Sequence, residues 1–405
     1  MQPADAALLA RDPGLPGLAL LLDDDALGAR LGAPVRRRYL RYKPGTSCVL
    51  GLDVDGRRCF AVAYAEQTAV KLAKSAASAP RGSVLVVDEG LRVLVARPSA
   101  DRDLPALARL ARDPSRALAR AMRGHDLTGA QVRVLAHKPQ RRWVGRLDLP
   151  DGAPAVLRVH RPEDAQATLA ALRVLDGVRA TTPQLLGSDP RLGLVAVSWL
   201  PGTALHELLD AGAATTAQLR ATGAALAELH AGALDGLTLR TPASDVEAVR
   251  RAAGAVADLL PALADQVAAL ATRLERLLPA VTVRPVAAHG DLSADQVVVG
   301  PDGRTGLIDL DAACAAEAEL DLGSAAASLQ VAAVGGAPVR PAAALDEVLD
   351  GYGGPVDGSR LQVHTAAALL RRVVEPFRTC RADWDDTAAQ LLALADAACP
   401  RPVRA

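Results

Sequence analysis

The chain has 405 residues, which at roughly 150 residues per domain predicts two or three structural units. Half of the residues are hydrophobic and the 46 basic residues balance the 46 acidic ones, which argues against a disordered chain and against nucleic acid or an anionic membrane as a partner. The five widely spaced cysteines form no CxxC motif, so neither a disulfide framework nor a zinc site is expected. With no signal peptide and no run of roughly 18 apolar residues, the sequence predicts a cytoplasmic protein.

An internal repeat organises the N-terminal half. The pattern LxxKPxxxxVxxLD occurs at 40–53 and again at 135–148, and the tripeptide Leu-Val-Ala at 94–96 recurs at 194–196. In each copy, β-branched and apolar runs between Gly, Pro and Asp predict a hairpin, a strand, a helix and two more strands. The first copy has its predicted turn at Gly56, strand at 60–64, helix at about 65–77 and further strands at 84–87 and 91–96; the second has its turn at Asp151-Gly152, strand at 155–159, helix at about 163–176 and further strands at 184–187 and 192–199.

Beyond Pro201 the apolar residues are spaced by three and four, which predicts helices. We expect Thr215 and Asp245 to be N-caps, Gly232 to end a helix and Pro261 to interrupt one. A β-rich segment at 289–311 contains two predicted strands, 297–299 and 305–310, joined by a Pro-Asp-Gly turn. The predicted helices span 215–232, 245–278, 342–352, 361–374 and 385–398.

The β-rich segment carries the candidate catalytic residues. Asp291 precedes its first strand and Asp309 ends its second, so a tight hairpin is expected to bring both carboxylates to one edge, with Gln296 between them. Carboxylate and amide oxygens suit Mg²⁺, which takes water and substrate phosphates as its other ligands. An acid that does not bind the metal can accept a proton from an alcohol.

The order His289-Gly-Asp291, then Gln296, then Ile-Asp309-Leu-Asp311 resembles the catalytic-loop and metal-loop pair of kinases. The HGD form is similar to the aminoglycoside phosphotransferase and choline kinase family. Three further segments resemble family elements in family order, and together the resemblance covers about 130–405; they are WLPGTAL at 199–205, LAELHA at 226–231 and ELDLG at 319–323. The resemblance implies an α+β, protein-kinase-like bilobal fold with a small αβ N-lobe at 126–200 and a mostly helical C-lobe at 201–405. The preceding region, 1–125, looks like an αβ cap that duplicates the N-lobe.

The resemblance also implies a role for each matching residue. Asp291 would be the catalytic base, and Asp309, Gln296 and Asp311 would hold Mg²⁺. His289 and Asp321 are expected to make structural hydrogen bonds rather than to take part in catalysis. The ATP-binding residues would be Arg158 in place of the phosphate-pairing lysine, Lys138, Arg141 and Arg142 in place of the glycine-rich loop, and Ser198, Trp199 and Leu200 beside the adenine.

The implied function is an ATP- and Mg²⁺-dependent transfer of a phosphoryl group to a hydroxyl of a small molecule: a sugar, amino sugar, aminoglycoside or choline-like alcohol. The alternative is a pseudokinase, favoured by Arg158 in place of lysine, by Gln296 in place of asparagine, and by the lack of an evident helix glutamate. The acids nearest to that glutamate's position are Glu163 and Asp164. A protein kinase is disfavoured by the HGD form and by the lack of an APE-type activation segment after Asp309. The acceptor, the choice between ATP and GTP, and the oligomeric state stay open.

Overall fold

The structure is a computed structural model that describes residues 3–150, 152, 154–279 and 284–401, and it divides into two compact units. Both units contain helices and antiparallel strands, as expected for an α+β fold. The first unit consists of Met1–Gln166, Leu185–Trp199 and Phe377–Trp384, and the second of Ala167–Gln184, Leu200–Pro376 and Asp385–Ala405.

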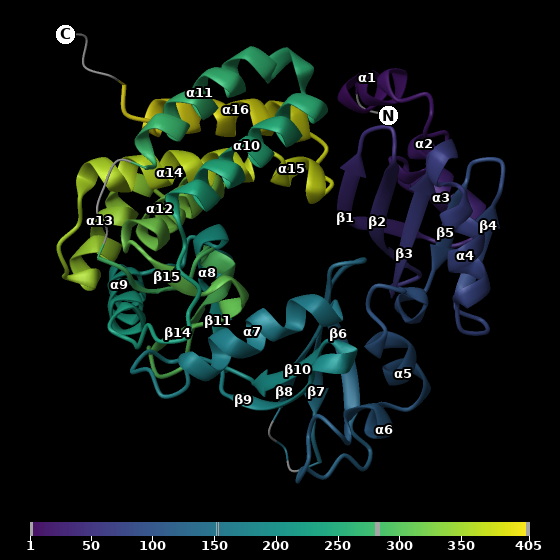
Figure 1. Ribbon diagram of the computed structural model, residues 1–405, viewed down its shortest axis with the longest axis horizontal. Helices are drawn as coiled ribbons and strands as arrows, with labels where there is room; N and C mark the ends of the chain where they lie inside the picture. Colours follow the sequence, from purple (N-terminus) through teal and green to yellow (C-terminus); the bar gives the residue numbers. More distant parts are fainter. Residues whose placement is uncertain (1–2, 151, 153, 280–283, 402–405) are drawn as a thin grey trace. The chain divides into compact units, whose positions relative to one another are not determined.

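An antiparallel sheet with the strand order β1-β2-β3-β5-β4 forms the N-terminal part of the first unit (Figure 1). Its third strand is buried from Cys59 to Tyr64 because that run is apolar at nearly every position. The helix α4 (Val70–Ser78) follows this strand, and its Leu72 packs into the same core as Val62 and Leu94. The strands are β1 (Val35–Lys43), β2 (Ser47–Val54), β3 (Arg57–Tyr64), β4 (Val84–Asp88) and β5 (Val93–Ala96).

The second sheet of this unit repeats the first, with the order β6-β7-β8-β10-β9. The helix α7 (Pro162–Val174) follows its third strand as α4 follows β3. This shared connectivity supports the predicted duplication. Of the turn predicted at Asp151-Gly152, Asp151 lies outside the described residues. The strands are β6 (Gln131–Lys138), β7 (Arg142–Asp148), β8 (Ala155–His160), β9 (Leu185–Asp189) and β10 (Leu194–Ser198).

Short helices that the sequence analysis did not predict complete the first unit. Each spans too few turns to show a clear period, and the caps are their better signal: Asp23 accepts from the N–H groups of Asp25 and Ala26, and Asp113 accepts from that of Arg116. The helices are α1 (Pro3–Arg11), α2 (Leu18–Leu21), α3 (Asp24–Leu31), α5 (Ala106–Arg112) and α6 (Pro114–Leu118).

A segment from near the C-terminus, Phe377–Trp384, belongs to the first unit. The indole Nε1 of Trp384 donates to Oδ1 of the buried Asp5 at 2.9 Å. The ring of Phe377 lies edge-on to Trp384 and to Tyr42, with centroids 5.0 and 6.5 Å apart. Both ends of the chain therefore contribute to one core.

Helices dominate the second unit. Pro261 interrupts a helix as predicted, and the predicted N-cap Thr215 forms a capping box with Gln218. The prediction that Asp245 is an N-cap was wrong: Thr241 caps that helix, which starts with a proline. The helices of this half of the chain are α8 (Leu205–Asp210), α9 (Thr216–His230), α10 (Pro242–Leu259), α11 (Ala264–Leu277), α12 (Glu319–Val334), α13 (Pro341–Tyr352), α14 (Gly358–Arg372), α15 (Glu375–Arg378) and α16 (Trp384–Ala398).

Two small sheets carry the β-rich segment of the second unit. One has the order β11-β13-β14 and the other pairs β12 with β15. The predicted strand 305–310 ends at Leu307, because Asp309 adopts a left-handed backbone conformation, with φ 66°, that a strand does not tolerate. The strands are β11 (Thr203–Ala204), β12 (Val286–Ala288), β13 (Val297–Val299), β14 (Thr305–Leu307) and β15 (Cys314–Ala316).

Among the described residues, no helix is both long enough and apolar enough to cross a membrane.

Candidate active site

A buried carboxylate holds the catalytic loop that follows β12. Asp321, on the first turn of α12, has no exposed surface and accepts hydrogen bonds from the backbone N–H groups of His289, at 2.6 Å, and Gly290, at 2.8 Å. Two N–H groups pointing at one carboxylate set the direction of the chain just before Asp291. The expected structural role of Asp321 is thus what the structure shows.

The charge of Asp321 is balanced from the opposite side by His230 of α9. Its Nε2 lies 3.0 Å from Asp321 Oδ2, and its Nδ1 lies 3.0 Å from the hydroxyl of Tyr352. Burial opposes ionisation of Asp321, but the hydrogen bond and charge of His230 prevail and lower the pKa of the carboxyl below its usual value. An ionised Asp321 only accepts hydrogen bonds, so His230 donates to it from Nε2.

The catalytic loop is joined directly to the loop that carries Asp309. Nε2 of His289 donates to the carbonyl oxygen of Ile308 at 2.8 Å, which gives His289 the structural role expected of it. Gly290 has φ 86°, and a Cβ there would lie 2.0 Å from the carbonyl oxygen of Ala312, so only glycine allows this close approach. The strands β12 and β15 pair immediately beside these contacts. The segments bearing Asp291 and Asp309 therefore pack against each other.

The predicted metal-binding residues come from this same loop and the hairpin beside it. The carbonyl oxygen of Gln296 accepts from the N–H of Ile308 at 2.9 Å, which holds Gln296 next to the residue before Asp309. The side-chain Oε1 of Gln296 accepts from the N–H of Ser293 at 3.0 Å and keeps one lone pair for another partner. A left-handed backbone at a residue other than glycine is costly, and such conformations concentrate at functional sites, which draws attention to Asp309.

This donor set fits Mg²⁺ rather than a softer metal, because Asp309, Asp311 and Gln296 offer only oxygen ligands. In the described part of the chain, no group of three or more His, Cys, Asp and Glu side chains is arranged to hold a metal ion. Mg²⁺ commonly takes one or two carboxylates together with substrate phosphates and water, so the phosphates of a bound nucleotide would supply the remaining ligands.

Two arginines of the second unit donate hydrogen bonds to the backbone of the catalytic loop. Arg240 donates to the carbonyl oxygen of Gly290 at 3.2 Å and pairs with Asp245 at 2.5 Å. Arg372, at the end of α14, donates to the carbonyl oxygen of Leu292 at 3.1 Å. The carbonyl groups on both sides of Asp291 are thus bound by guanidinium groups.

These arginines and Arg371 surround Asp291 with positive charge, which the sequence analysis missed. Burial, together with the charges of Arg240 and Arg372, lowers the pKa of Arg371 to about 10, while the carboxylate of Asp291 acts in the opposite direction. With a pKa of about 10, the guanidinium of Arg371 stays protonated at neutral pH. The consecutive Arg371-Arg372 pair, at the end of an otherwise apolar predicted helix, was the available signal.

The predicted phosphate-binding residues lie in the first unit. Arg158 is buried on β8 between Val144 of β7 and Val195 of β10. Lys138 and Arg142 flank the turn between β6 and β7; the N–H of Arg141 closes it on the carbonyl oxygen of Lys138 at 3.1 Å. Nζ of Lys138 lies 6.0 Å from the centre of the Tyr39 ring.

The residues expected beside adenine divide between the units. Ser198 ends β10 opposite Ala155, and Trp199 stacks under the guanidinium of Arg146 at 4.9 Å, both in the first unit. Leu200 belongs to the second unit, where Asp291, Gln296, Asp309 and Asp311 also lie.

The two acids nearest to the position of the helix glutamate pair with Arg161. Nη2 of Arg161 lies 2.7 Å from Asp164, and its Nη1 lies 3.6 Å from Glu163. The sequence analysis did not anticipate this pairing.

A second buried ion pair lies at the end of β15, the strand that follows the loop bearing Asp309. Glu317, directly after β15, accepts from Arg360 at 2.9 Å and from His364 at 2.5 Å. Arg360 also donates to the carbonyl oxygens of Leu277 and Leu278, at the C-terminal end of α11. Burial opposes ionisation of Glu317, but the hydrogen bonds from His364 and Arg360 lower its pKa from 4.5 to about 2.

We expect Glu317→Gln to lower the free energy of unfolding by about 3 kcal/mol at pH 7, because it leaves Arg360 buried without its counter-charge. The wild-type carboxylate stabilises the fold above pH 4.5, and this contribution is lost as the pH falls toward about 2, so the two proteins converge in that range. Urea unfolding at pH 7 and pH 3 measures the difference. The control Glu247→Gln, which removes an exposed pair with Arg251, is expected to cost less than about 1 kcal/mol. A difference for Glu317→Gln that is equal at both pH values would contradict the assignment.

Comparisons with known proteins show the family of the chain. The model of the phosphotransferase enzyme family matches residues 143–364, more than half of the chain. No curated protein matches the chain.

Solved structures show the same fold. Choline kinase from Cryptosporidium parvum Iowa II has a TM-score of 0.54 at 11% identity, covering 71% of this chain and 95% of that one. A choline/ethanolamine kinase family protein from Mesorhizobium loti has a TM-score of 0.52 at 18% identity, covering 72% and 95%. The AMP-bound complex of spectinomycin phosphotransferase has a TM-score of 0.51 at 15% identity, covering 71% and 98%. These likenesses confirm the predicted protein-kinase-like fold. With the family match, they establish that the chain belongs to the phosphotransferase enzyme family and is an enzyme that phosphorylates a hydroxyl group of a small molecule.

Proposed function

We propose that the chain transfers the γ-phosphoryl group of ATP to a hydroxyl group of a sugar or a similar small alcohol, with Mg²⁺ as cofactor. The observation that carries this proposal is the joined pair of loops, in which Asp321 and Ile308 hold His289 and Gly290, the two residues directly before Asp291. This arrangement supports a catalytic carboxylate beside an oxygen-rich metal site. The adenine nucleotide named with spectinomycin phosphotransferase supports ATP as the donor.

In the proposed reaction, Asp291 orients the acceptor hydroxyl and accepts its proton as the oxygen bonds to the γ-phosphorus and the bond to the departing ADP breaks. Asp309, Gln296 and Asp311 would hold Mg²⁺, which neutralises phosphate charge. Arg158 would bind phosphate oxygens in place of a lysine, and its planar fork permits two parallel hydrogen bonds. Lys138, Arg141 and Arg142 would contact the phosphates from their turn, and Ser198, Trp199 and Leu200 would bind adenine.

The charges near Asp291 bear on the choice of acceptor. Arg240, Arg371 and Arg372 oppose a positive group close to the reacting hydroxyl, since like charges repel strongly where water is partly excluded. Within the class proposed here, uncharged sugars are therefore favoured over aminoglycosides and choline-like alcohols.

A phosphate-transfer screen tests the proposal. ADP release is measured at fixed Mg-ATP with panels of sugars, amino sugars, aminoglycosides and amino alcohols, with Mg-GTP as a parallel donor. We expect turnover with at least one uncharged sugar. Binding of Mg-ATP without transfer to any acceptor would instead indicate a pseudokinase.

Replacing Asp309 by asparagine is expected to weaken Mg-ATP binding at least about tenfold and to abolish turnover, because the amide oxygen lacks the negative charge with which the carboxylate attracts a divalent cation. Isothermal titration calorimetry with Mg-ATP measures the affinity. The matched control is Asp302→Asn, which changes an exposed acid at the tip of the same hairpin. Equal affinity in the Asp309 variant and the wild type would contradict the metal assignment.

A further inference from the structure

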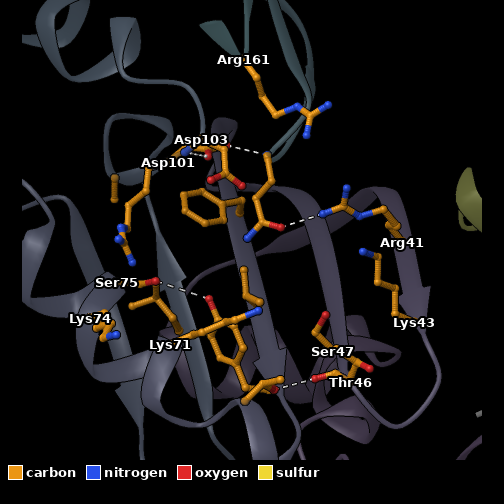
Figure 2. Close-up of a pocket in the computed structure, with 18 residues that line it drawn as sticks. Arg41, Lys43, Thr46, Ser47, Lys71, Lys74, Ser75, Asp101, Asp103 and Arg161 are labelled. Atoms are coloured by element: carbon orange, nitrogen blue, oxygen red, sulfur yellow. Dashed lines mark hydrogen bonds between the residues drawn. The ribbon is translucent and has the colours of Figure 1, made fainter. Parts of the chain in front are cut away.

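The first sheet of the first unit and the helix α4 line an open cavity of about 510 Å³ that the proposed reaction does not use. Its floor is formed by side chains of β3, including Phe60, Val62 and Tyr64. Figure 2 shows its two walls: Lys71 and Lys74 of α4 on one side, and Arg41 and Lys43 of β1 on the other. The volume lies within the range of small-molecule binding sites.

The lining of this cavity is strongly basic. Six cationic side chains face two acidic ones, Asp101 and Asp103. The chain contains only four lysines, and three of them line this one cavity. The cationic residues are Arg41, Lys43, Lys71, Lys74, Arg102 and Arg161.

The acids do not neutralise this charge. Asp101 is buried and accepts from the backbone N–H of Gln140 at 2.7 Å, with His137 at 3.4 Å. Within the described part of the chain, no carboxylate lies within ion-pair distance of Lys43, Lys71, Lys74 or Arg102, whereas Arg161 is paired. The cavity therefore keeps a surplus of positive charge, and a surplus of this kind in a concave site attracts anions.

The uncharged groups of the lining suit a phosphorylated molecule. The hydroxyl groups of Thr46, Ser47 and Ser75 can donate hydrogen bonds to phosphate oxygens, and lysine ammonium groups bind phosphate as point charges. The aromatic floor of Phe60 and Tyr64 offers an apolar surface for the rest of a ligand. The hydroxyl of Tyr64 is held 3.4 Å from Ser75, which fixes that side of the cavity.

We propose that this cavity binds a small phosphate ester or polyphosphate, at a site separate from the one proposed for ATP. Gln140 and Arg161 reach it from the neighbouring second sheet, but none of the residues assigned above to ATP, Mg²⁺ or catalysis lines it. The site belongs to the first copy of the repeat, whose third strand has no basic residue from Cys59 to Tyr64; most of the cations of the site come instead from β1 and α4.

The test is calorimetric titration of the full chain in EDTA at low ionic strength, with inorganic pyrophosphate, glucose 6-phosphate, metal-free ATP and citrate as separate probes. The variant K71Q/K74Q removes two charges from the cavity. The control R36Q/R123Q removes two exposed charges from the same unit outside it. We expect at least one phosphorylated probe to bind the wild type. The same probe is expected to bind K71Q/K74Q at least about tenfold more weakly, and to bind the control and D309N with an affinity within about twofold of wild type. The phosphorylated probe that binds most tightly shows whether the site prefers a phosphate ester or a polyphosphate.

Three results would overturn the proposal: no binding by any phosphorylated probe, the same loss in R36Q/R123Q as in K71Q/K74Q, or citrate binding as tightly as the phosphorylated probes. Because Lys71 and Lys74 are exposed, K71Q/K74Q is expected to fold, and its thermal midpoint verifies this. The single variant K43Q, on the opposite wall, gives an independent measurement: its affinity is expected to fall as well, and an unchanged value would count against the proposal.

Discussion

Replacing Asp291 by asparagine is expected to lower kcat by about 10²–10⁴-fold while the stability of the protein stays within about 0.5 kcal/mol of wild type. The amide keeps the shape of the side chain but cannot accept the proton of the acceptor hydroxyl. The loop is held by Asp321, Ile308 and the two arginines through its backbone, so its position does not depend on the Asp291 carboxylate. Turnover is measured with the acceptor found in the screen. The affinity for Mg-ATP is expected to remain within about threefold of wild type, which corresponds to a difference in binding free energy of about 0.6 kcal/mol.

The control for this variant is Asp295→Asn, an exposed acid four residues further on that bonds only to Ser293 among the described residues. We expect it to keep wild-type turnover. If Asp291→Asn retained the wild-type rate, Asp291 would not be the base and the proposed mechanism would fail.

Asp321→Asn is expected to lower both stability and turnover. The new amide retains one oxygen for the two backbone N–H groups of His289 and Gly290, and its NH₂ group must face a donor. It also removes the charge that His230 pairs with. Leaving such buried groups without partners costs about 2–4 kcal/mol. The loosened loop then presents Asp291 in a wider range of positions, so kcat falls as well.

Unfolding in urea and initial rates measure the two effects of Asp321→Asn. The matched control is Glu319→Gln, an acid two residues earlier on the same helix whose side chain accepts a single exposed hydrogen bond from Asp357. It is expected to change stability by less than about 1 kcal/mol. Normal stability with lost turnover in Asp321→Asn would show that the carboxylate takes part in the reaction instead of supporting the loop.

Local patterns in the sequence predicted much of the fold, and the family resemblance predicted the structural role of Asp321. The repeat predicted two equivalent sheets because their strands are short, apolar and separated by clear turns, and both sheets have the same order. Pro261 predicted a helix boundary from its missing N–H. The resemblance of ELDLG at 319–323 to a family element predicted structural hydrogen bonds from Asp321, and these bonds reach His289 and Gly290 from a distant part of the chain.

Features that depend on packing were not predictable in the same way. The helix α12 was missed because residues from Leu320 to Ala327 are buried on every side, so no amphipathic period marks it. The contact of Trp384 with Asp5 joins opposite ends of the chain and has no local signal. The charge around Asp291 arises from arginines on separate helices that meet only in the folded protein.

The loop bearing Asp309 is fastened at both ends by paired strands: β14 before it pairs with β13, and β15 after it pairs with β12. Swinging this loop away would break the β12–β15 pairing and the bond from His289 to Ile308 together. Displacement of the Asp309 loop is therefore coupled to the disruption of both contacts, and the loop cannot shift independently of them.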